Sequence, residues 1–168
     1  MKILTNISKE TPSQSKLLIP IIEELLNNQE LTLKNINEVI AVNGPGSFTG
    51  VRLGVTVAKT ISYCLNIPLK SISSIDLIAL SVEENIDYSV AIKDPKGYYV
   101  GEYSQNKTLT GEYFYLSNNE FQNYEINKKV IKNIPIKWNN IYKYNILKNE
   151  DCFNMKPLYI KKIEVEKW

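Results

Sequence analysis

The sequence contains no histidine among its 168 residues. Histidine is the usual general acid or base near neutral pH, and it completes Ser-His-Asp triads, Cys-His pairs and HExxH metal sites. Its absence excludes these three kinds of site together. Any catalysis by this chain would have to use carboxylates, lysines or tyrosines.

Cysteines and long apolar runs are also scarce. Cys64 and Cys152 lie far apart and form no CxxC pair, which argues against a disulfide framework or a zinc site. The longest apolar stretches, such as residues 17–22, are far shorter than a membrane span. Residues 1–6 offer no apolar stretch of the length of a secretory signal. We therefore expect a cytoplasmic protein with reduced thiols and no membrane partner.

Arginine is nearly missing, since Arg52 is the only arginine among 20 basic residues. A lone arginine in a lysine-rich chain invites a specific explanation. The net charge of +2 is too small to argue for nucleic-acid binding by itself. The chain is 43% hydrophobic and 23% charged, which is ordinary for a globular protein, and its length fits one domain or two small lobes.

The first half alternates between helix and strand. A capping box over residues 11–14 predicts the start of a helix that ends near Asn27, with one broad apolar face over residues 17–26. Pro20 lies inside that pattern and predicts a kink or a later start. This helix carries the first candidate interface side chains.

The segments that follow predict a strand at residues 39–42 and an apolar helix at residues 51–65. A further strand is expected at residues 69–72 and a third helix at residues 73–84. This order implies right-handed crossovers and at least one parallel strand pair. The fold class is therefore α/β.

The second half has a different pattern. Asp, Pro and Gly in residues 94–97 predict a tight turn, and residues 89–103 form a hairpin around it. Residues 108–116 predict a third strand and residues 157–160 a last short one. Residues 117–151 are rich in Asn, Lys and Tyr without clear periodicity, so no element is assigned there.

The most informative segment lies between a strand and a helix and holds four of the seven glycines within eleven residues. Such a loop can approach a phosphate closely, and a helix N-terminus favours an anion. The Walker A and Rossmann patterns both fail, because Gly50 precedes Val51 and Arg52 and lies one place late for GxGxxG. A tight turn in which Ser47 or Thr49 caps the helix and Gly54 permits close packing is the simpler interpretation. The candidate residues of this loop are Gly44, Pro45, Gly46, Ser47, Phe48, Thr49, Gly50, Arg52 and Gly54.

The complete string GPGSFTGVRLG, residues 44–54, resembles the signature of the TsaB (YeaZ) family. Residues 15–26 resemble its "S..LlP.I.elL" helix, and residues 66–79 its "gip…gvSsLealA" segment. The hairpin at residues 88–103 occupies the place of the family's hairpin, and residues 157–161 resemble its closing "P.YlR". An eleven-residue string of this kind is a specific match.

This resemblance implies an actin-like ATPase (ASKHA, ribonuclease H-like) fold with two small lobes, residues 1–85 and residues 86–168, the second carrying the hairpin. It implies a non-catalytic subunit of the complex that forms threonylcarbamoyladenosine on tRNA. Such a subunit binds and supports the catalytic subunit TsaD and works beside the ATPase TsaE and a separate threonylcarbamoyl-adenylate synthase. Contact with tRNA is expected only through the complex, and a homodimer is an option. No metal or cofactor is expected on this chain, and ATP or ADP at the complex interface stays open.

The sequence also departs from the family pattern. Members begin with a strand that carries an Asp-Thr-Ser-like turn, followed by a second strand, whereas here the first helix starts within about fifteen residues of Met1. The N-terminal lobe is therefore expected to be shortened, with residues 1–4 as a degenerate strand or with the first strands missing. Asp94 stands in a turn that differs from the family's "DAR.ge", so no functional role is carried onto it.

The resemblance places the contact with TsaD on helices of the N-terminal lobe. Arg52 lies near a helix start, where the dipole disfavours a cation, which favours a structural or interface contact. Gly50 is expected to need a positive φ, and Asp76 to cap a helix. Tyr142 and Tyr144 lie among lysines. Two interpretations are open for them, contact with RNA or half-buried positions on strands. The candidate interface residues are Leu18, Ile22, Leu25, Val51, Val55, Ala58 and Lys59.

Two other classes of function remain open at this point. A nucleotide-binding actin-like ATPase would bind nucleotide as an isolated chain through its glycine loop. A purely structural homodimer would need no other subunit.

Overall fold

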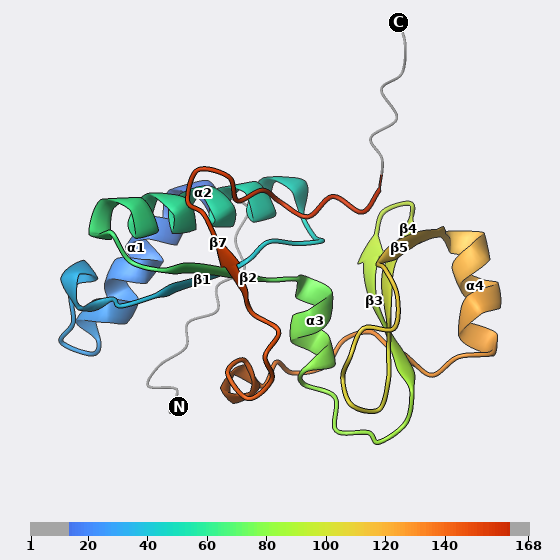
Figure 1. The fold of residues 1–168 in the computed structure, drawn as a ribbon. Coiled ribbons are helices and arrows are strands. Elements are labelled where there is room, and N and C mark those ends of the chain that lie inside the picture. The colour runs from blue at the N-terminus through green and yellow to red at the C-terminus, as the bar shows by residue number, and fades with distance from the viewer. Residues whose placement is uncertain (1–13, 162–168) are drawn as a thin grey trace, which may run out of the picture.

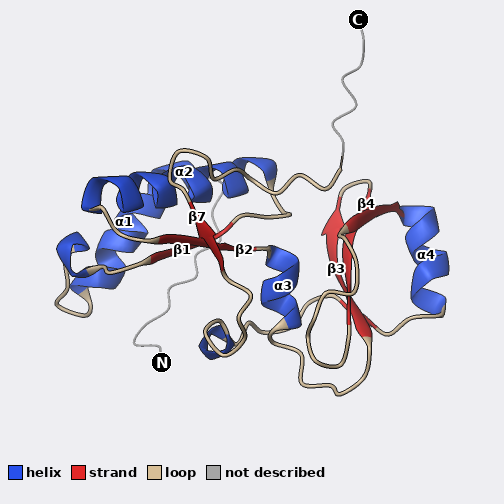
Figure 2. Cartoon of the chain, viewed as in Figure 1, coloured by secondary structure: helices blue, strands red, loops and turns tan. Residues whose placement is uncertain are grey.

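The computed structural model describes residues 14–161, which form two small sheets set side by side with helices packed on them (Figure 1). Figure 2 shows that long loops connect the later elements, notably residues 132–147 and residues 151–161. Within the described range, no helix combines the length and apolar character needed to cross a bilayer. The elements are α1 (Gln14–Asn27), the 3-10 turn η1 (Leu33–Asn35), β1 (Val39–Val42), α2 (Phe48–Leu65), β2 (Leu69–Ile72), α3 (Ser74–Ala79), β3 (Tyr88–Asp94), β4 (Gly97–Tyr103), β5 (Phe114–Ser117), α4 (Asn118–Ile126), β6 (Val130–Ile131), the 3-10 turn η2 (Trp138–Asn140) and β7 (Lys148–Glu150).

The first sheet has the strand order β1-β2-β7. β1 and β2 are parallel, with Val39 opposite Leu69, which confirms the parallel pair expected from the strand–helix–strand order. α2 packs on one face of this sheet, where Val55 and Ala58 join a buried core with Met155. The opposite face is covered by residues of the long loop, including the buried Ile141.

The third strand of this sheet corrects the sequence-based expectation. β7 pairs antiparallel with β2, with Glu150 opposite Leu69, although the sequence pattern assigns no element to that part of the chain. Residues 157–160 are not a strand; one backbone bond, from Leu158 N to Asn43 O at 2.8 Å, ties them to the end of β1. The chain therefore returns to the first sheet late in the sequence.

The second sheet has the order β5-β4-β3-β6. The β3–β4 hairpin is antiparallel with Asp94 opposite Gly97, as the turn at residues 94–97 predicted. α3 packs on one face, through Ile75 and Ala79, and α4 covers the other through the buried Phe121 (Figure 1). The expected third strand is present but shorter, because it begins only at Phe114.

The three predicted helices agree with the sequence pattern except at some ends, whereas α4 lies where no element was predicted. α1 ends at Asn27 as predicted, and Pro20 lies inside it, so the proline does not mark its start; the predicted capping box lies outside the described residues. The expected first strand at residues 1–4 also lies outside them. α3 ends at Ala79, short of the predicted Glu84; Leu80 is its C-cap, and the Leu80 carbonyl accepts a hydrogen bond from Asn140 Nδ2 at 2.7 Å.

Candidate functional site

The loop that leaves β1 is held from three directions by backbone hydrogen bonds. Asn43 donates to Ile72 O at 3.1 Å, Ser74 donates to Gly44 O at 2.7 Å, and Leu158 donates to Asn43 O at 2.8 Å. Gly44 has φ +104°, a region that L side chains rarely adopt, and the Gly44–Pro45 peptide bond is cis. The loop is thus fixed to the end of β2, the start of α3 and the last described residues.

α2 begins earlier than predicted, at Phe48, and this corrects two assignments in the loop. Ser47 is the helix cap, and its hydroxyl accepts a hydrogen bond from Gly50 N at 3.3 Å, in agreement with one of the two alternatives for the cap. Gly50 therefore lies in the first helical turn, and the positive φ expected of it belongs to Gly44. A Cβ added at Gly54 would meet no described atom within 4 Å, so this glycine does not serve close packing.

The single arginine is fixed by two aromatic side chains. The Arg52 guanidinium lies 3.6 Å from the centroid of the Phe48 ring, and Arg52 Nε donates to the Tyr159 hydroxyl at 2.8 Å. The Phe48 and Tyr159 rings are themselves 6.4 Å apart. Among the described residues, no carboxylate lies within ion-pair distance of Arg52. The guanidinium is oriented but has no anionic partner within this part of the chain.

The closing segment, residues 151–161, runs along α2 and is fastened to it a second time by Lys59. Lys59 Nζ donates to Phe153 O at 3.1 Å and to Met155 O at 3.3 Å. Tyr63, one turn further along α2, packs edge-on against Phe153 with 5.4 Å between the centroids. Lys59, expected at a partner interface, thus has a structural role that joins two segments distant in the sequence.

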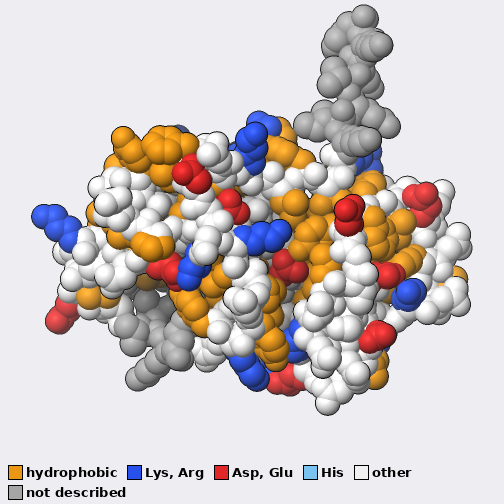
Figure 3. Space-filling model, in the orientation of Figure 1, with side chains coloured by type: hydrophobic (Ala, Val, Ile, Leu, Met, Phe, Trp, Pro, Cys, Tyr) orange, Lys and Arg blue, Asp and Glu red, His pale blue; other side chains and the backbone are white. Residues whose placement is uncertain are grey.

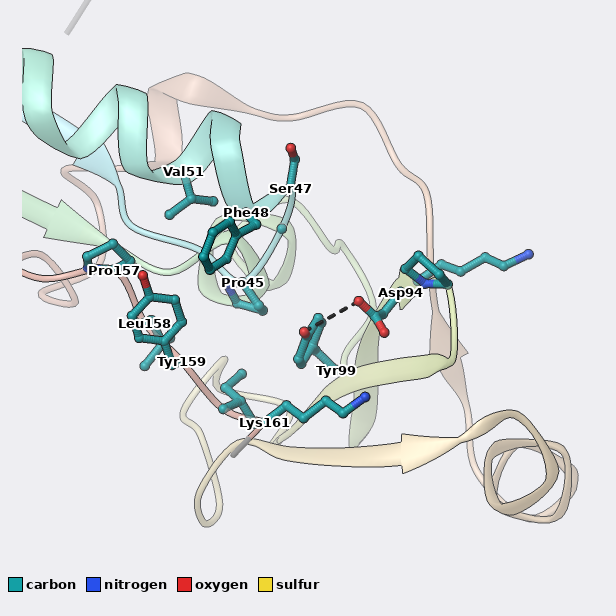
Figure 4. A pocket seen from close by; sticks show the side chains of 14 residues that line it. Pro45, Ser47, Phe48, Val51, Asp94, Tyr99, Pro157, Leu158, Tyr159 and Lys161 are labelled. Atoms are coloured by element: carbon teal, nitrogen blue, oxygen red, sulfur yellow. Dashed lines mark hydrogen bonds between the residues drawn. The ribbon is translucent and has the colours of Figure 1, made fainter. Parts of the chain in front are cut away.

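Three distant segments enclose a pocket of about 580 Å³ between the two sheets (Figure 4). The motif loop supplies Pro45 and the half-exposed Phe48, and the hairpin turn supplies Tyr99. The closing segment supplies Tyr159 and, at the rim, Lys161. The complete lining is Pro45–Phe48, Val51, Lys93–Pro95, Tyr99 and Pro157–Lys161.

The charged groups of this pocket are few and already partly engaged. Asp94 accepts hydrogen bonds from the hydroxyls of Tyr115 at 3.0 Å and Tyr99 at 3.5 Å. Burial, with the bond to Asp94, raises the pKa of Tyr115 to about 12. The sequence assigns no role to Asp94, yet the fold brings it to the pocket. The walls are mainly aromatic, proline and aliphatic side chains, which suit an apolar segment or a ring better than a catalytic centre.

The predicted interface residues divide into buried and half-buried groups. Val55 and Ala58 are 3% and 6% exposed, so they form core, contrary to the expectation of a surface contact. Val51 and the α1 residues Leu18, Ile22 and Leu25 are half-buried. A surface contact through the two helices stays a prediction.

The large apolar side chains that α1 and α2 do expose are not among the predicted interface residues. They are Ile19, Phe48 and Tyr63, which are 46%, 55% and 63% exposed. Phe48, Arg52 and Tyr63 share one face of α2, since the intervals of four and eleven residues match the helical repeat. The spacing of Phe48, Arg52 and Tyr63 can be read from the sequence. The apolar stripe of α2 that packs on the sheet is a stronger signal, so the sequence analysis selected that stripe instead.

Asp76 also differs from its predicted role. Ser73 caps α3 by accepting from Asp76 N at 2.8 Å, whereas the Asp76 carboxylate accepts from the hydroxyls of Tyr103 at 2.7 Å and Tyr113 at 2.6 Å. Burial, together with the charge of Asp76, raises the pKa of Tyr103. This buried network joins α3 to the second sheet and is not a cap.

No described group of three or more cysteine or carboxylate side chains is placed to hold a metal ion. The motif loop and the closing segment resemble segments of one family, and the hairpin occupies the place of that family's hairpin, although its turn differs. The structure brings all three to one pocket, which the sequence did not predict.

Comparisons with known proteins show which sequences this chain resembles. A family model described as "TsaD: tRNA N6-adenosine threonylcarbamoyltransferase" matches residues 10–97, just over half of the chain. The tRNA threonylcarbamoyladenosine biosynthesis protein TsaB of Buchnera aphidicola subsp. Schizaphis graminum is 33% identical over 119 residues, which are 66% of this chain and 56% of the relative. The TsaB protein of Bacillus subtilis is 39% identical over 61 residues, 36% of this chain and 27% of that relative. The chain thus spans about half the length, or less, of these relatives.

Solved structures show the same fold. YeaZ from Pseudomonas aeruginosa superposes with a TM-score of 0.57 at 24% identity, covering 65% of this chain and 56% of that one. A second structure, of an uncharacterized protein similar to peptidase YEAZ from Pseudomonas aeruginosa, gives a TM-score of 0.69 at 17% identity and covers 87% and 83%. The α/β actin-like fold is confirmed. From its motif, its fold and the family model together, the chain belongs to the TsaB (YeaZ) family.

Proposed function

We propose that this chain is a non-catalytic subunit of the cytoplasmic machinery that forms threonylcarbamoyladenosine on tRNA, where it binds the catalytic subunit TsaD. The supporting observation is the exposed face of α2 formed by Phe48, Arg52 and Tyr63. We call these three residues the α2 face. Figure 3 shows hydrophobic side chains gathered over α2 as well as over the second sheet.

The chemistry of the α2 face suits a protein partner. Aromatic side chains and arginine are enriched where partners bury their contacts, and both aromatic residues here are more than half exposed. Arg52 has its guanidinium oriented before any partner arrives, so little conformational entropy is lost when a carboxylate binds it. A cation near a helix N-terminus is disfavoured on its own, and an incoming carboxylate would offset that cost. A helix of TsaD with an acidic residue beside an apolar stripe would match this face.

The other members of the complex enter this proposal indirectly. TsaE and tRNA would join through the assembled complex, and this chain would hold no cofactor of its own. ATP or ADP would bind at the interface of the complex. Residues 14–161 would act as a support for the catalytic subunit.

Co-purification of this chain with the cognate TsaD, followed by an assay of threonylcarbamoyl transfer to tRNA, tests the proposal. We expect Phe48→Ala and Tyr63→Ala each to weaken binding by about 10-fold or more, because each removes an exposed aromatic anchor of the size that produces hot spots. Ile126→Ala is the matched control, since Ile126 is 75% exposed on α4, away from α2. Equal binding by all three variants would contradict the proposed surface.

Arg52 is tested separately, because its charge and its planar shape can be distinguished. Arg52→Lys keeps the charge but loses the stacked, bidentate geometry, whereas Arg52→Ala loses both. We expect both to reduce TsaD affinity, Ala more than Lys, with only a small fall in melting temperature, because the hydrogen bond lost with Tyr159 is exposed. If the chain forms a homodimer, does not bind TsaD and does not change the rate of threonylcarbamoyl transfer, the result favours a purely structural homodimer.

A further inference from the structure

A second pocket, of about 660 Å³, has Asp76 of α3 in its lining. The β4–β5 loop forms one wall through residues 106–109, and residues 143–148, which lead into β7, form the other. None of residues 43–54 lines it. We name it the lysine pocket, after Lys107, Lys143 and Lys148.

The lining of the lysine pocket carries three lysines and one carboxylate, and Glu83, outside the lining, attracts the charge of Lys107. Lys143 and Lys148 have no carboxylate within ion-pair distance among the described residues. The single carboxylate of the lining, Asp76, is buried, and its oxygens already accept hydrogen bonds from Tyr103 and Tyr113. A bound anion would therefore balance the positive charge of Lys143 and Lys148.

The ammonium groups of two of these lysines lie near the same aromatic ring. The Nζ atoms of Lys107 and Lys143 lie 5.9 Å and 5.5 Å from the centroid of Tyr144. Burial first, and then the positive charge of Lys143, lower the pKa of Lys107. The positive charges of Lys107 and Lys143 repel each other, and a bound anion would relieve that repulsion.

The backbone of Lys107 is held in an uncommon conformation. Its φ is +61°, in the left-handed region that glycine and asparagine favour, although lysine carries a full side chain. Lys107 N donates to Ser104 O at 2.9 Å, and Ser104 N donates to Thr108 O at 2.9 Å, so the tight loop fixes this geometry. Lys107 Nζ also donates to Val82 O, which anchors its ammonium group at the pocket wall. Strain of this kind is concentrated at ligand sites.

Neutral donors and ring faces complete the lining. Asn106 and Asn145 offer amide groups and Thr108 a hydroxyl, and the half-buried Tyr144 contributes part of its ring to the lining. Ammonium groups and amides bind phosphate oxygens, and an aromatic face stacks on a base. The combination fits a group that carries a phosphate next to a planar ring.

We propose that the lysine pocket binds the phosphate of a nucleotide, within an RNA strand or free, through Lys143 and Lys148, with the base against Tyr144. The inference does not depend on the α2 face or on any partner subunit. The two proposals can therefore fail separately, since this one is measured on the chain alone.

The test uses the full chain with three probes: a fluorescently labelled single-stranded oligoribonucleotide, AMP and inorganic phosphate. The variant Lys143→Ala/Lys148→Ala should bind the nucleotide probe about 10-fold more weakly and with a reduced salt dependence, because two phosphate contacts are lost. Lys96→Ala/Lys156→Ala is the charge-matched control, since both lysines are exposed and lie outside the pocket. Its affinity should be unchanged.

Tyr144 supplies a second variant that does not alter charge. Tyr144→Phe keeps the ring and should bind normally, whereas Tyr144→Ala should weaken the oligoribonucleotide or AMP but leave inorganic phosphate unaffected. Tight binding of the strand alone identifies RNA as the source of the phosphate, and equal binding of AMP identifies a free nucleotide. Equal losses in the pocket variant and its charge-matched control, or no binding of any probe, would overturn the proposal.

Discussion

At the scale of single residues, the geometry of the motif depends on Gly44. Its φ of +104° turns the chain out of β1, and a Cβ there would lie 3.4 Å from both Leu158 O and Val51 Cγ1. The closing segment and α2 thus approach the turn closely on two sides. The positive φ of Gly44, the first glycine of the motif, favours glycine at that position. For Gly54, the fourth, the described atoms show no such requirement.

We expect Gly44→Val to destabilise the fold by about 1–3 kcal/mol, because a β-branched residue is strained at positive φ. Gly54→Ala should instead stabilise it by roughly 0.5–1 kcal/mol, since alanine is the better helix former and open space receives its methyl group. Urea unfolding of both variants checks the pair. If both variants changed the free energy of unfolding equally and in the same direction, the two glycines would not differ in their backbone requirement.

At the scale of elements, Tyr124 adds hydrogen bonds between α4 and the second sheet. The Tyr124 hydroxyl donates to Glu102 Oε1 at 2.6 Å on β4 and lies 2.6 Å from Ser89 Oγ on β3. The bond from Tyr124 lowers the pKa of Glu102 from its ordinary 4.5; burial opposes this, and Lys128 adds to it. α4 buries Phe121 against this sheet, and the polar contact of Tyr124 adds to that packing.

Tyr124→Phe should lower the free energy of unfolding by about 1–2 kcal/mol near neutral pH, since it removes two hydrogen bonds and leaves Glu102 and Ser89 short of a partner. A carboxyl whose folded pKa is depressed stabilises the protein above its unfolded pKa and loses that contribution as pH falls through the folded value. The gap between the unaltered chain and the variant should therefore narrow below about pH 4.5.

Denaturant unfolding at several pH values measures that gap. Tyr63→Phe is the control, because the Tyr63 side chain is exposed and forms no hydrogen bond through its hydroxyl with a described residue. It should leave stability unchanged throughout. A gap for Tyr124→Phe that stays constant with pH would show that Glu102 does not carry the effect.

At the scale of the whole molecule, the last described part of the chain completes the first sheet. β7 adds its third strand, and Met155, 2% exposed, fills the core between that sheet and α2. Lys59 and Arg52 fasten the closing segment along the helix. The division at residues 85 and 86 stays a prediction, but the first sheet is built with residues from both sides of it.

Met155→Ala should therefore destabilise the molecule by about 2–5 kcal/mol, as for other methionines truncated in a core. Phe153→Ala, two residues away and 72% exposed, should cost less than about 1 kcal/mol. Circular dichroism and intrinsic fluorescence should follow one coincident transition in both variants, because the closing segment contacts both sheets. Separate transitions would indicate lobes that unfold independently.

Most helices and strands of the first half were predictable because local periodicity specifies them. β1, α2, β2 and the β3–β4 hairpin carry apolar patterns and turn residues within short windows. α4, β6 and β7 were missed, since their sequences are polar or short. α4 buries only Phe121, and β7 has the sequence Lys-Asn-Glu, so pairing with β2 and not its composition makes it a strand.

By itself, the sequence determined the family, the parallel α/β start and a helix cap in the motif loop, because a motif and the hydrophobic period are local properties. Only the tertiary structure decided which glycine takes the positive φ, which α2 residues are core, and that Asp76 bonds two tyrosines. It alone joined the motif loop, the hairpin turn and the closing segment around one pocket. These depend on contacts between residues far apart in the chain, and no local pattern encodes which distant segments will meet.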